Sequence, residues 1–212
     1  MQVKICGLKD EQMLEAAVKA GADFIGLVFF EPSPRNVSID MAINLAGIAR
    51  DQAKIVALVV NADDALLSEI TEKVQPNYFQ LHGAETAGRT AEINEQFKIP
   101  LIKAIGVKTA EDVIRADDYT SSQIILFDAK ADPTITKLPG GNGIPFDWRL
   151  LTGQKEKRNF MLSGGLTPLN VREAIKLTGA SMVDVSSGVE TAPGVKDSAL
   201  IAHFIKAAKS QE

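Results

Sequence analysis

Two hydrophobic patterns alternate along this chain of 212 residues. Short apolar runs rich in Val, Ile and Phe predict buried strands, whereas longer stretches with apolar residues three and four apart predict amphipathic helices. The predicted strands are Val3–Cys6, Phe24–Phe29, Ile55–Val60, Tyr78–Leu81, Leu101–Ile105, Ile124–Asp128, Phe160–Ser163 and Met182–Val185. The predicted helices are Glu11–Lys19, Met41–Arg50, Ala65–Val74, Glu85–Gln96, Ala110–Ala116, Pro168–Leu177 and Ser198–Ala208, with a weaker one over Phe146–Leu151.

The spacing of the strands predicts their arrangement. Several start about 23 residues apart, near positions 78, 101 and 124 and again near 160 and 183, which indicates a recurring βα unit. Eight such units with buried strands predict an α/β fold, a closed parallel (β/α)8 or TIM barrel, as a single domain over residues 1–212. The alternative is an open doubly wound sheet, which a GxGxxG turn after the first strand would support. That turn reads Cys6-Gly7-Leu8-Lys9, so the barrel is favoured.

Composition and charge exclude several classes of function. The chain is 45% hydrophobic and 24% charged, and its net charge of −4 argues against binding to nucleic acid. A run of about 18 apolar residues is absent, which predicts no membrane span, and the N-terminus lacks the pattern of a signal peptide. A single cysteine excludes an intramolecular disulfide and a cysteine-based zinc site, so we expect a reducing, cytoplasmic setting.

Five candidate residues follow from the barrel. Catalytic groups of such barrels come from the carboxyl ends of strands and the loops after them. Cys6, His82, Asp128 and Asp184 lie at strand ends, and Arg35 lies in the loop after the second strand. Each also has a structural interpretation. Cys6 would then be a buried structural thiol, and His82 a histidine whose ring is hydrogen-bonded within the fold. Asp128 would cap a turn or form a salt bridge, Asp184 would cap its loop, and Arg35 would be a solvated surface arginine.

Two glycine-bearing turns follow the last two strands. They read Ser163-Gly164-Gly165 and Ser186-Ser187-Gly188. Such turns expose backbone N–H groups, and the loops after strands seven and eight are the usual phosphate site of this barrel. The turns therefore predict phosphate binding by Gly164, Gly165, Ser187 and Gly188, against the alternative that the glycines only serve turn geometry. A third glycine-rich segment, Pro139–Gly143, follows Asp128 and is typical of a mobile cover over a site.

The motifs together resemble phosphoribosylanthranilate isomerases along the whole chain. They are Lys4-Ile5-Cys6-Gly7, Ser33-Pro34-Arg35, Gln80-Leu81-His82-Gly83, Phe127-Asp128, Gly140-Gly141-Asn142-Gly143, Leu162-Ser163-Gly164-Gly165-Leu166 and Val183-Asp184-Val185-Ser186-Ser187-Gly188-Val189-Glu190. Two positions depart from the family, which usually has threonine where Asn142 stands and often alanine where Ser163 stands.

The resemblance implies an Amadori rearrangement of a phosphoribosyl amine in tryptophan biosynthesis. Asp128 would be the general acid and Cys6 the general base, and no cofactor or metal would be needed because an iminium ion serves as the electron sink. Arg35 would face the anthranilate carboxylate, with His82, Gly141 and Asp184 as further substrate contacts. Because free aspartate is ionised and free cysteine mostly protonated at pH 7, both groups need help from the fold.

Two other functions remain as alternatives. One is an isomerase for another phosphoribosyl amine, in which paired aspartates would be acid and base, so that Cys6 argues against it. The other is a non-catalytic phosphosugar-binding barrel, which would require neither Cys6 nor Asp128. The partner in every case is a small molecule, and the chain is expected to be a monomer or a homodimer.

Overall fold

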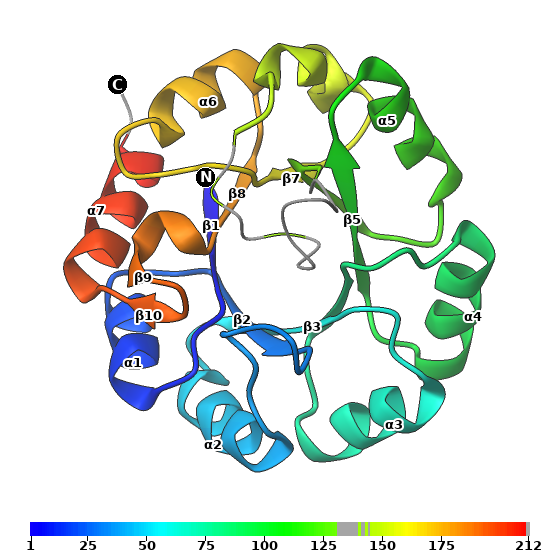
Figure 1. Ribbon diagram of the computed structural model, residues 1–212, viewed down its shortest axis with the longest axis vertical. Helices are drawn as coiled ribbons and strands as arrows, with labels where there is room; N and C mark the ends of the chain where they lie inside the picture. The colour runs from blue at the N-terminus through cyan, green and yellow to red at the C-terminus, as the bar shows by residue number, and fades with distance from the viewer. Residues whose placement is uncertain (131–139, 141–142, 144, 211–212) are drawn as a thin grey trace.

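The computed structural model describes residues 1–130, 140, 143 and 145–210, and it has the predicted barrel. Eight parallel strands close in chain order, and the last pairs with the first in a register that sets Lys4 beside Asp184. Figure 1 looks along the barrel and shows the strands enclosed by a ring of helices. The strands are β1 (Gln2–Cys6), β2 (Phe24–Phe29), β3 (Lys54–Val59), β4 (Tyr78–Leu81), β5 (Leu101–Val107), β6 (Ile124–Ala129), β7 (Phe160–Leu162) and β8 (Met182–Val185). The open doubly wound alternative is therefore wrong.

The helices fall close to the predicted ranges. They are α1 (Glu11–Lys19), α2 (Ile39–Ala49), α3 (Asp64–Lys73), α4 (Ala87–Phe97), α5 (Ala110–Ile114), α6 (Val171–Thr178) and α7 (Ser198–Lys209). Side chains explain the shifted starts, because Ser38 and Asp63 cap α2 and α3 one residue before each helix begins. The prediction that α4 begins at Glu85 is wrong, since Thr86 is its cap and the Glu85 carboxylate is bound to buried Lys103.

Three predicted helical segments differ in kind or length. The segment predicted at Phe146–Leu151 is the 3-10 helix η2 (Trp148–Leu151), and another, η3 (Gln154–Glu156), follows it. The end of the predicted Ala110–Ala116 helix lies in η1 (Arg115–Asp118). The helix predicted from Pro168 starts only at Val171, because Asn170 accepts from Thr167 N and donates to Gly165 O, which holds the preceding residues in a turn.

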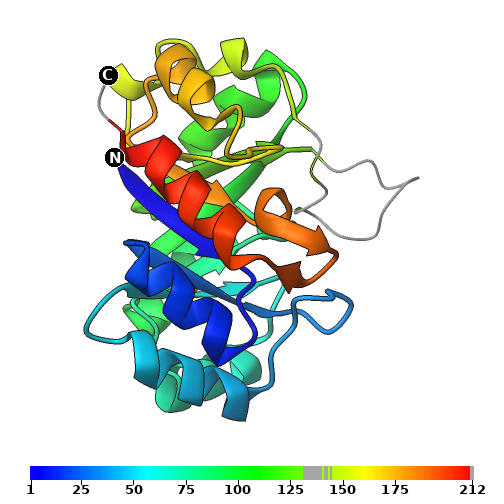
Figure 2. The ribbon, with the colours of Figure 1, turned by 90° about the vertical axis from the view of Figure 1, so that its left-hand side faces the viewer.

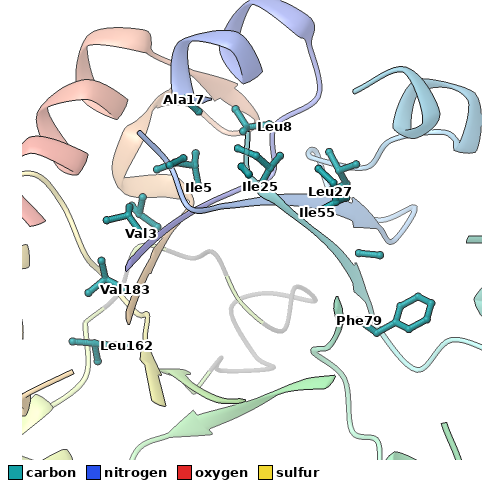
Figure 3. Close-up of a cluster of buried hydrophobic side chains, with 14 of the residues drawn as sticks. Val3, Ile5, Leu8, Ala17, Ile25, Leu27, Ile55, Phe79, Leu162 and Val183 are labelled. Atoms are coloured by element: carbon teal, nitrogen blue, oxygen red, sulfur yellow. The ribbon is translucent and has the colours of Figure 1, made fainter. Parts of the chain in front are cut away.

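The core forms two shells on either side of the barrel wall. Along a strand successive side chains point to opposite faces, so Val3 and Ile5 pack outward against helices while Lys4 and Cys6 belong to the interior. Figure 3 shows Val3, Ile5 and Ile25 in the outer shell, between the strands and the helices. The interior is closed by apolar side chains below the mouth: Phe24, Val56, Ile102, Ala104, Ile124, Leu126, Met161 and Met182.

A short hairpin after β8 was not predicted. Residues 187–189 form the 3-10 helix η4 (Ser187–Val189), and β9 (Glu190–Ala192) pairs with β10 (Val195–Lys196) in a separate two-stranded sheet. Figure 2 shows this hairpin and the loop after β2 at the same end of the barrel, which is the end where β1 and β8 terminate. The hairpin thus adds Glu190 and Lys196 to the mouth. Among the described residues, no helix has the length and apolar character that would let it cross a membrane.

Candidate active site

Cys6 ends β1 inside the mouth of the barrel, next to a buried ion pair. The thiol is 4% exposed, and Lys4, two residues earlier on the same face of the strand, is fully buried. The Lys4 ammonium donates to Asp184 Oδ1 at 2.9 Å, and the Ser163 hydroxyl donates to the other carboxylate oxygen at 3.3 Å. Burial raises the pKa of Cys6, and the positive charges of Lys4 and Lys196 oppose that rise.

Gly26 has no side chain, and this makes room for the Cys6 thiol and the Lys4 ammonium. It lies opposite Cys6 in the register of β1 and β2. A β-carbon at this position would stand 2.9 Å from Cys6 Sγ and 3.0 Å from Lys4 Nζ, closer than ordinary contacts. The thiol and the ammonium therefore both crowd against one side-chain-free position on β2.

Arg35 is also held inside the mouth, by the hairpin. It is 6% exposed, and its Nε and one terminal nitrogen donate to the two carboxylate oxygens of Glu190 at 2.7 and 2.8 Å. Lys196 donates to the same carboxylate at 2.7 Å and to Ser186 O at 3.0 Å. The Ser186 hydroxyl donates in turn to the carbonyl of Cys6, at 3.1 Å. The interpretation of Arg35 as a solvated surface residue is therefore wrong.

Arg35 and Lys196 both favour the ionised form of Glu190. Burial alone raises the pKa of Glu190, but the hydrogen bonds from Arg35 and the charge of Lys196 bring it down to about 2. The carboxylate is thus ionised throughout the neutral range. It fixes the guanidinium of Arg35 in one orientation, as a bidentate pair does.

Asp128 is the second-last residue of β6, three strands from β1 around the barrel. It is linked through His82, in the loop after β4, to Gln80 on β4. Asp128 Oδ2 lies 3.3 Å from His82 Nε2, and His82 Nδ1 lies 2.8 Å from the side-chain nitrogen of Gln80. In this orientation the Gln80 amide donates, so a neutral His82 carries its proton on Nε2, directed at Asp128. Gln80 is fully buried, and its Oε1 has no hydrogen-bond partner in the described structure.

A second buried ion pair shapes the turn that carries His82. Lys103 donates to Glu85 Oε2 and to the carbonyl of Gly83, each at 2.8 Å. The Glu85 carboxylate in turn accepts from the backbone N–H of Gly83 and of Asn61. These bonds tie the loop after β4 to β5 and to the end of β3, which fixes the position of His82.

The glycine turns after β7 and β8 meet each other and lie against the segment after β6. Gly164 and Gly165 have positive φ values of 86° and 68°, which favour glycine. A β-carbon on Gly188 would lie 1.8 Å from Leu166 O, so the two turns are in contact. In the described structure, the backbone N–H groups of Gly164, Gly165, Ser187 and Gly188 donate to no protein acceptor. Neither turn opens directly into an α-helix, because α6 starts six residues after Gly165 and the second turn is the 3-10 helix η4.

Two described glycines of the segment after β6 lie over this site. A β-carbon on Gly140 would stand 2.5 Å from His82 Nε2 and 2.6 Å from Asp128 Oδ2. One on Gly143 would stand 3.3 Å from the Ser187 hydroxyl. Gly141 and Asn142 lie outside the described residues, and so does most of the segment predicted as a cover.

Sequence reasoning selected most of the polar residues at the mouth but not their partners. Of the predicted residues, Cys6, Arg35 and Asp184 lie on one side, where the structure adds Gly26, Glu190 and Lys196. His82 and Asp128, also predicted, lie on the other side, where the structure adds Gln80. Alternation along the strands could have indicated Gln80, since it shares a strand face with His82. No comparable alternation indicates Glu190 and Lys196, because the strands of their hairpin are too short to show a periodic pattern.

A closed (β/α)8 barrel with a thiol, a carboxylate and open glycine turns at one mouth defines the chain as a barrel enzyme. The model of the N-(5'phosphoribosyl)anthranilate (PRA) isomerase family matches residues 3–207. The chain belongs to this family.

Relatives and solved structures agree with that assignment. The chain is 49% identical to the N-(5'-phosphoribosyl)anthranilate isomerase of Rhodopseudomonas palustris strain BisA53, over 100% of this chain and 97% of the relative. A crystal structure of the isomerase from Thermotoga maritima superposes with a TM-score of 0.88 at 37% identity, covering 99% of this chain and 98% of that one. Another, of an isomerase in complex with reduced 1-(o-carboxyphenylamino)-1-deoxyribulose 5-phosphate, gives 0.86 at 36% identity with the same coverage.

Proposed function

We propose that this chain converts N-(5-phosphoribosyl)anthranilate into 1-(2-carboxyphenylamino)-1-deoxyribulose 5-phosphate, the Amadori rearrangement of tryptophan biosynthesis. One observation carries the assignment of roles: Cys6 at the end of β1 and Asp128 near the end of β6 lie at the same mouth, in a chain of this isomerase family. An acid and a base on different sides of one mouth can act on the two ring atoms bonded to C1, the ring oxygen and C2. The solved relative with a reduced deoxyribulose phosphate supports a ligand of this class.

Asp128 is the general acid of the proposed first step. Its carboxyl proton passes to the furanose ring oxygen, the bond from that oxygen to C1 breaks, and the nitrogen lone pair forms the C1=N iminium. His82 is placed to orient Asp128, because its Nε2 faces Oδ2 and Gln80 holds its other nitrogen. We assign His82 this positioning role in addition to substrate contact.

Cys6 is the general base of the second step. Its thiolate takes the proton from C2, and the electrons of the C–H bond form the C1=C2 double bond while the iminium nitrogen regains its lone pair. The resulting enolamine then gains a proton at C1 and loses one from the C2 hydroxyl, which gives the ketone. The sugar is isomerised with no net gain or loss of atoms or electrons.

The remaining predicted residues bind the substrate in this proposal. The open N–H groups of Gly164, Gly165, Ser187 and Gly188 suit the phosphate oxygens, since backbone donors in such turns form anion sites. Arg35 is held by Glu190 near Cys6 and would direct the anthranilate carboxylate. Asp184 accepts from Lys4 and Ser163 and is the candidate contact for a sugar hydroxyl.

Turnover of phosphoribosylanthranilate, followed by the loss of anthranilate-type fluorescence, tests the roles of Cys6 and Asp128. Cys6→Ser and Asp128→Asn should each lose about 10²–10⁴-fold in kcat, because each removes one proton-transfer group. Asp118→Asn, an exposed aspartate remote from the strand ends, is the matched control and should keep full activity. Full activity in either site variant, with a wild-type circular dichroism spectrum, would disprove its assigned role.

We further propose a reducing, cytoplasmic setting and a monomeric or homodimeric state. The one cysteine is buried at the mouth and free, and its proposed chemistry requires it to stay reduced. The isomerase of Thermotoga maritima is described as dimeric. Light scattering of the purified protein would give the oligomeric state of this chain directly.

A further inference from the structure

A fully buried lysine in the barrel interior needs an explanation. Lys4 has no exposed surface, and a buried charge is costly unless its partners compensate for it. Within the described structure its ammonium makes one hydrogen bond to oxygen, with Asp184 Oδ1. The proposed reaction gives no role to Lys4, although the residue lies directly below the thiol.

Three features bring Lys4 to Cys6. The two residues share a face of β1, and Cys6 lies opposite Gly26 in the sheet. Since Sγ and Nζ both lie about 3 Å from the place of a β-carbon on Gly26, they cannot be farther apart than the sum of those two distances. The charge of the Lys4 ammonium therefore acts on the thiol at short range and favours its ionised form.

Several buried charges surround the thiol in the described structure. Lys4 on β1, Arg35 in the loop after β2 and Lys196 on β10 are buried cations. They face two buried carboxylates, Asp184 on β8 and Glu190 on β9. Through their charges, Lys4 and Lys196 favour a thiolate at Cys6, and Asp184 opposes it.

We propose that Lys4 is the positioning residue that favours the thiolate form of Cys6, and that Asp184 limits this effect by sharing the same ammonium. The inference rests on the proposed function, in which Cys6 is the base. The charge of Lys4 acts on the thiol more strongly than that of Lys196, and its place inside the barrel keeps water from screening it. Asp184 carries the opposite charge, so it disfavours the thiolate while fixing the lysine side chain.

This arrangement predicts shifts of opposite sign for two substitutions. Lys4→Met keeps the shape of the side chain and removes the charge, so the thiol should ionise about one to three pH units higher than in the wild type. Asp184→Asn keeps Lys4 and removes the competing carboxylate, so the thiol should ionise at a lower pH than in the wild type. A lysine that served only packing would produce neither shift.

The pH titration of the thiol tests the proposal without any substrate. Because the chain has one cysteine, the thiolate absorbance in the far ultraviolet belongs to Cys6, and Cys6→Ser supplies the background to subtract. The rate of alkylation by iodoacetamide at each pH, followed by mass spectrometry of the intact chain, is the second measurement. Both experiments are done on the whole purified protein.

The double variant Lys4→Met/Asp184→Asn guards against misfolding, because it leaves no unpaired charge from the pair. Its thiol should ionise between the pH values found for the two single variants. Ser163→Ala, which removes only a hydroxyl bound to Asp184, is the matched control and should titrate close to the wild type. Wild-type titration in folded Lys4→Met and in the double variant, or shifts of the same sign in both single variants, would overturn the proposal.

Turnover separates this inference from the proposed function. Lys4→Met should lose activity at neutral pH and recover much of the loss as the pH rises toward the new ionisation point of Cys6. A loss that is the same at every pH would overturn the positioning role alone. Full turnover by Cys6→Ser would instead overturn the role of Cys6 as base, whatever the titration shows.

Discussion

At the scale of single residues, Gly26 shows how closely the site is packed. Adding a methyl group at this position would force Cys6 Sγ and Lys4 Nζ apart, and both atoms belong to buried side chains with little room to move. Gly26→Ala should therefore lower the free energy of unfolding by about 1–3 kcal/mol, the usual cost of overpacking. It should also reduce turnover, because the thiol would be displaced from its position in the site. Urea denaturation and kcat give the two values.

Gly47 provides the matched control for that substitution. It lies in α2, where an added β-carbon would meet nothing within 4 Å. Gly47→Ala should raise the free energy of unfolding by about 0.5–1 kcal/mol, since alanine is favoured over glycine inside a helix. Equal effects of the two substitutions would contradict the crowding at Gly26.

The individual residues of the site could be predicted from the sequence only in part. Cys6 and Asp128 are identified because each ends an apolar run, which places them at the mouth of any barrel. The burial of Lys4 follows from the same alternation, yet its pairing with Asp184 depends on the closure of β8 onto β1, between residues far apart in the chain. The pairing of Arg35 with Glu190 likewise depends on where a loop and a hairpin meet in space.

At the scale of elements, strands and helices were predicted well because each carries its own periodic pattern and its own cap. Predicted and observed ends differ mainly where a side chain overrides the pattern, as Thr86 does at α4 and Asn170 at α6. The β9–β10 hairpin was missed because β10 has only two residues and β9 is largely polar. Its stability comes from Lys196 and Glu190 inside the mouth rather than from an apolar face.

The hairpin predicts a particular dependence of stability on pH. The pKa of Glu190 in the folded protein is about 2, below its ordinary value of 4.5, so the folded state gains stability at a pH above 4.5 and loses it as the pH falls toward 2. The shift corresponds to about 3 kcal/mol. Glu190→Gln should therefore be less stable than the wild type by that order at neutral pH, and the difference should vanish near pH 2.

Unfolding by urea at a series of pH values measures this difference. Glu15→Gln, an exposed carboxylate on α1, is the control, and it should change the free energy of unfolding by less than about 0.5 kcal/mol. A difference between Glu190→Gln and the wild type that stays constant down to pH 2 would show that the ion pair with Arg35 and Lys196 does not stabilise the fold.

At the scale of the whole molecule, closure joins the two ends of the chain. The first strand pairs with the last, and α7 packs against β1, α1 and α6. In Figure 2, α7 runs alongside β1. The strand that carries Lys4 and Cys6 is therefore held by the final segments of the sequence. We infer that residues 1–212 form a single domain, because a smaller part would leave the barrel open along β1.

Phe204 on α7 tests the contribution of this closure. Its side chain is fully buried in the outer shell of the core, so Phe204→Ala should lower the free energy of unfolding by about 3–5 kcal/mol. Leu169→Ala is the matched control, since Leu169 is 97% exposed in the loop before α6 and its truncation should change stability by less than about 0.5 kcal/mol. Because Phe204 belongs to the outer shell of the core, outside the barrel wall, the fraction of Phe204→Ala that is folded at low temperature should keep a wild-type kcat. A wild-type free energy of unfolding in Phe204→Ala would show that α7 is not needed to close the barrel.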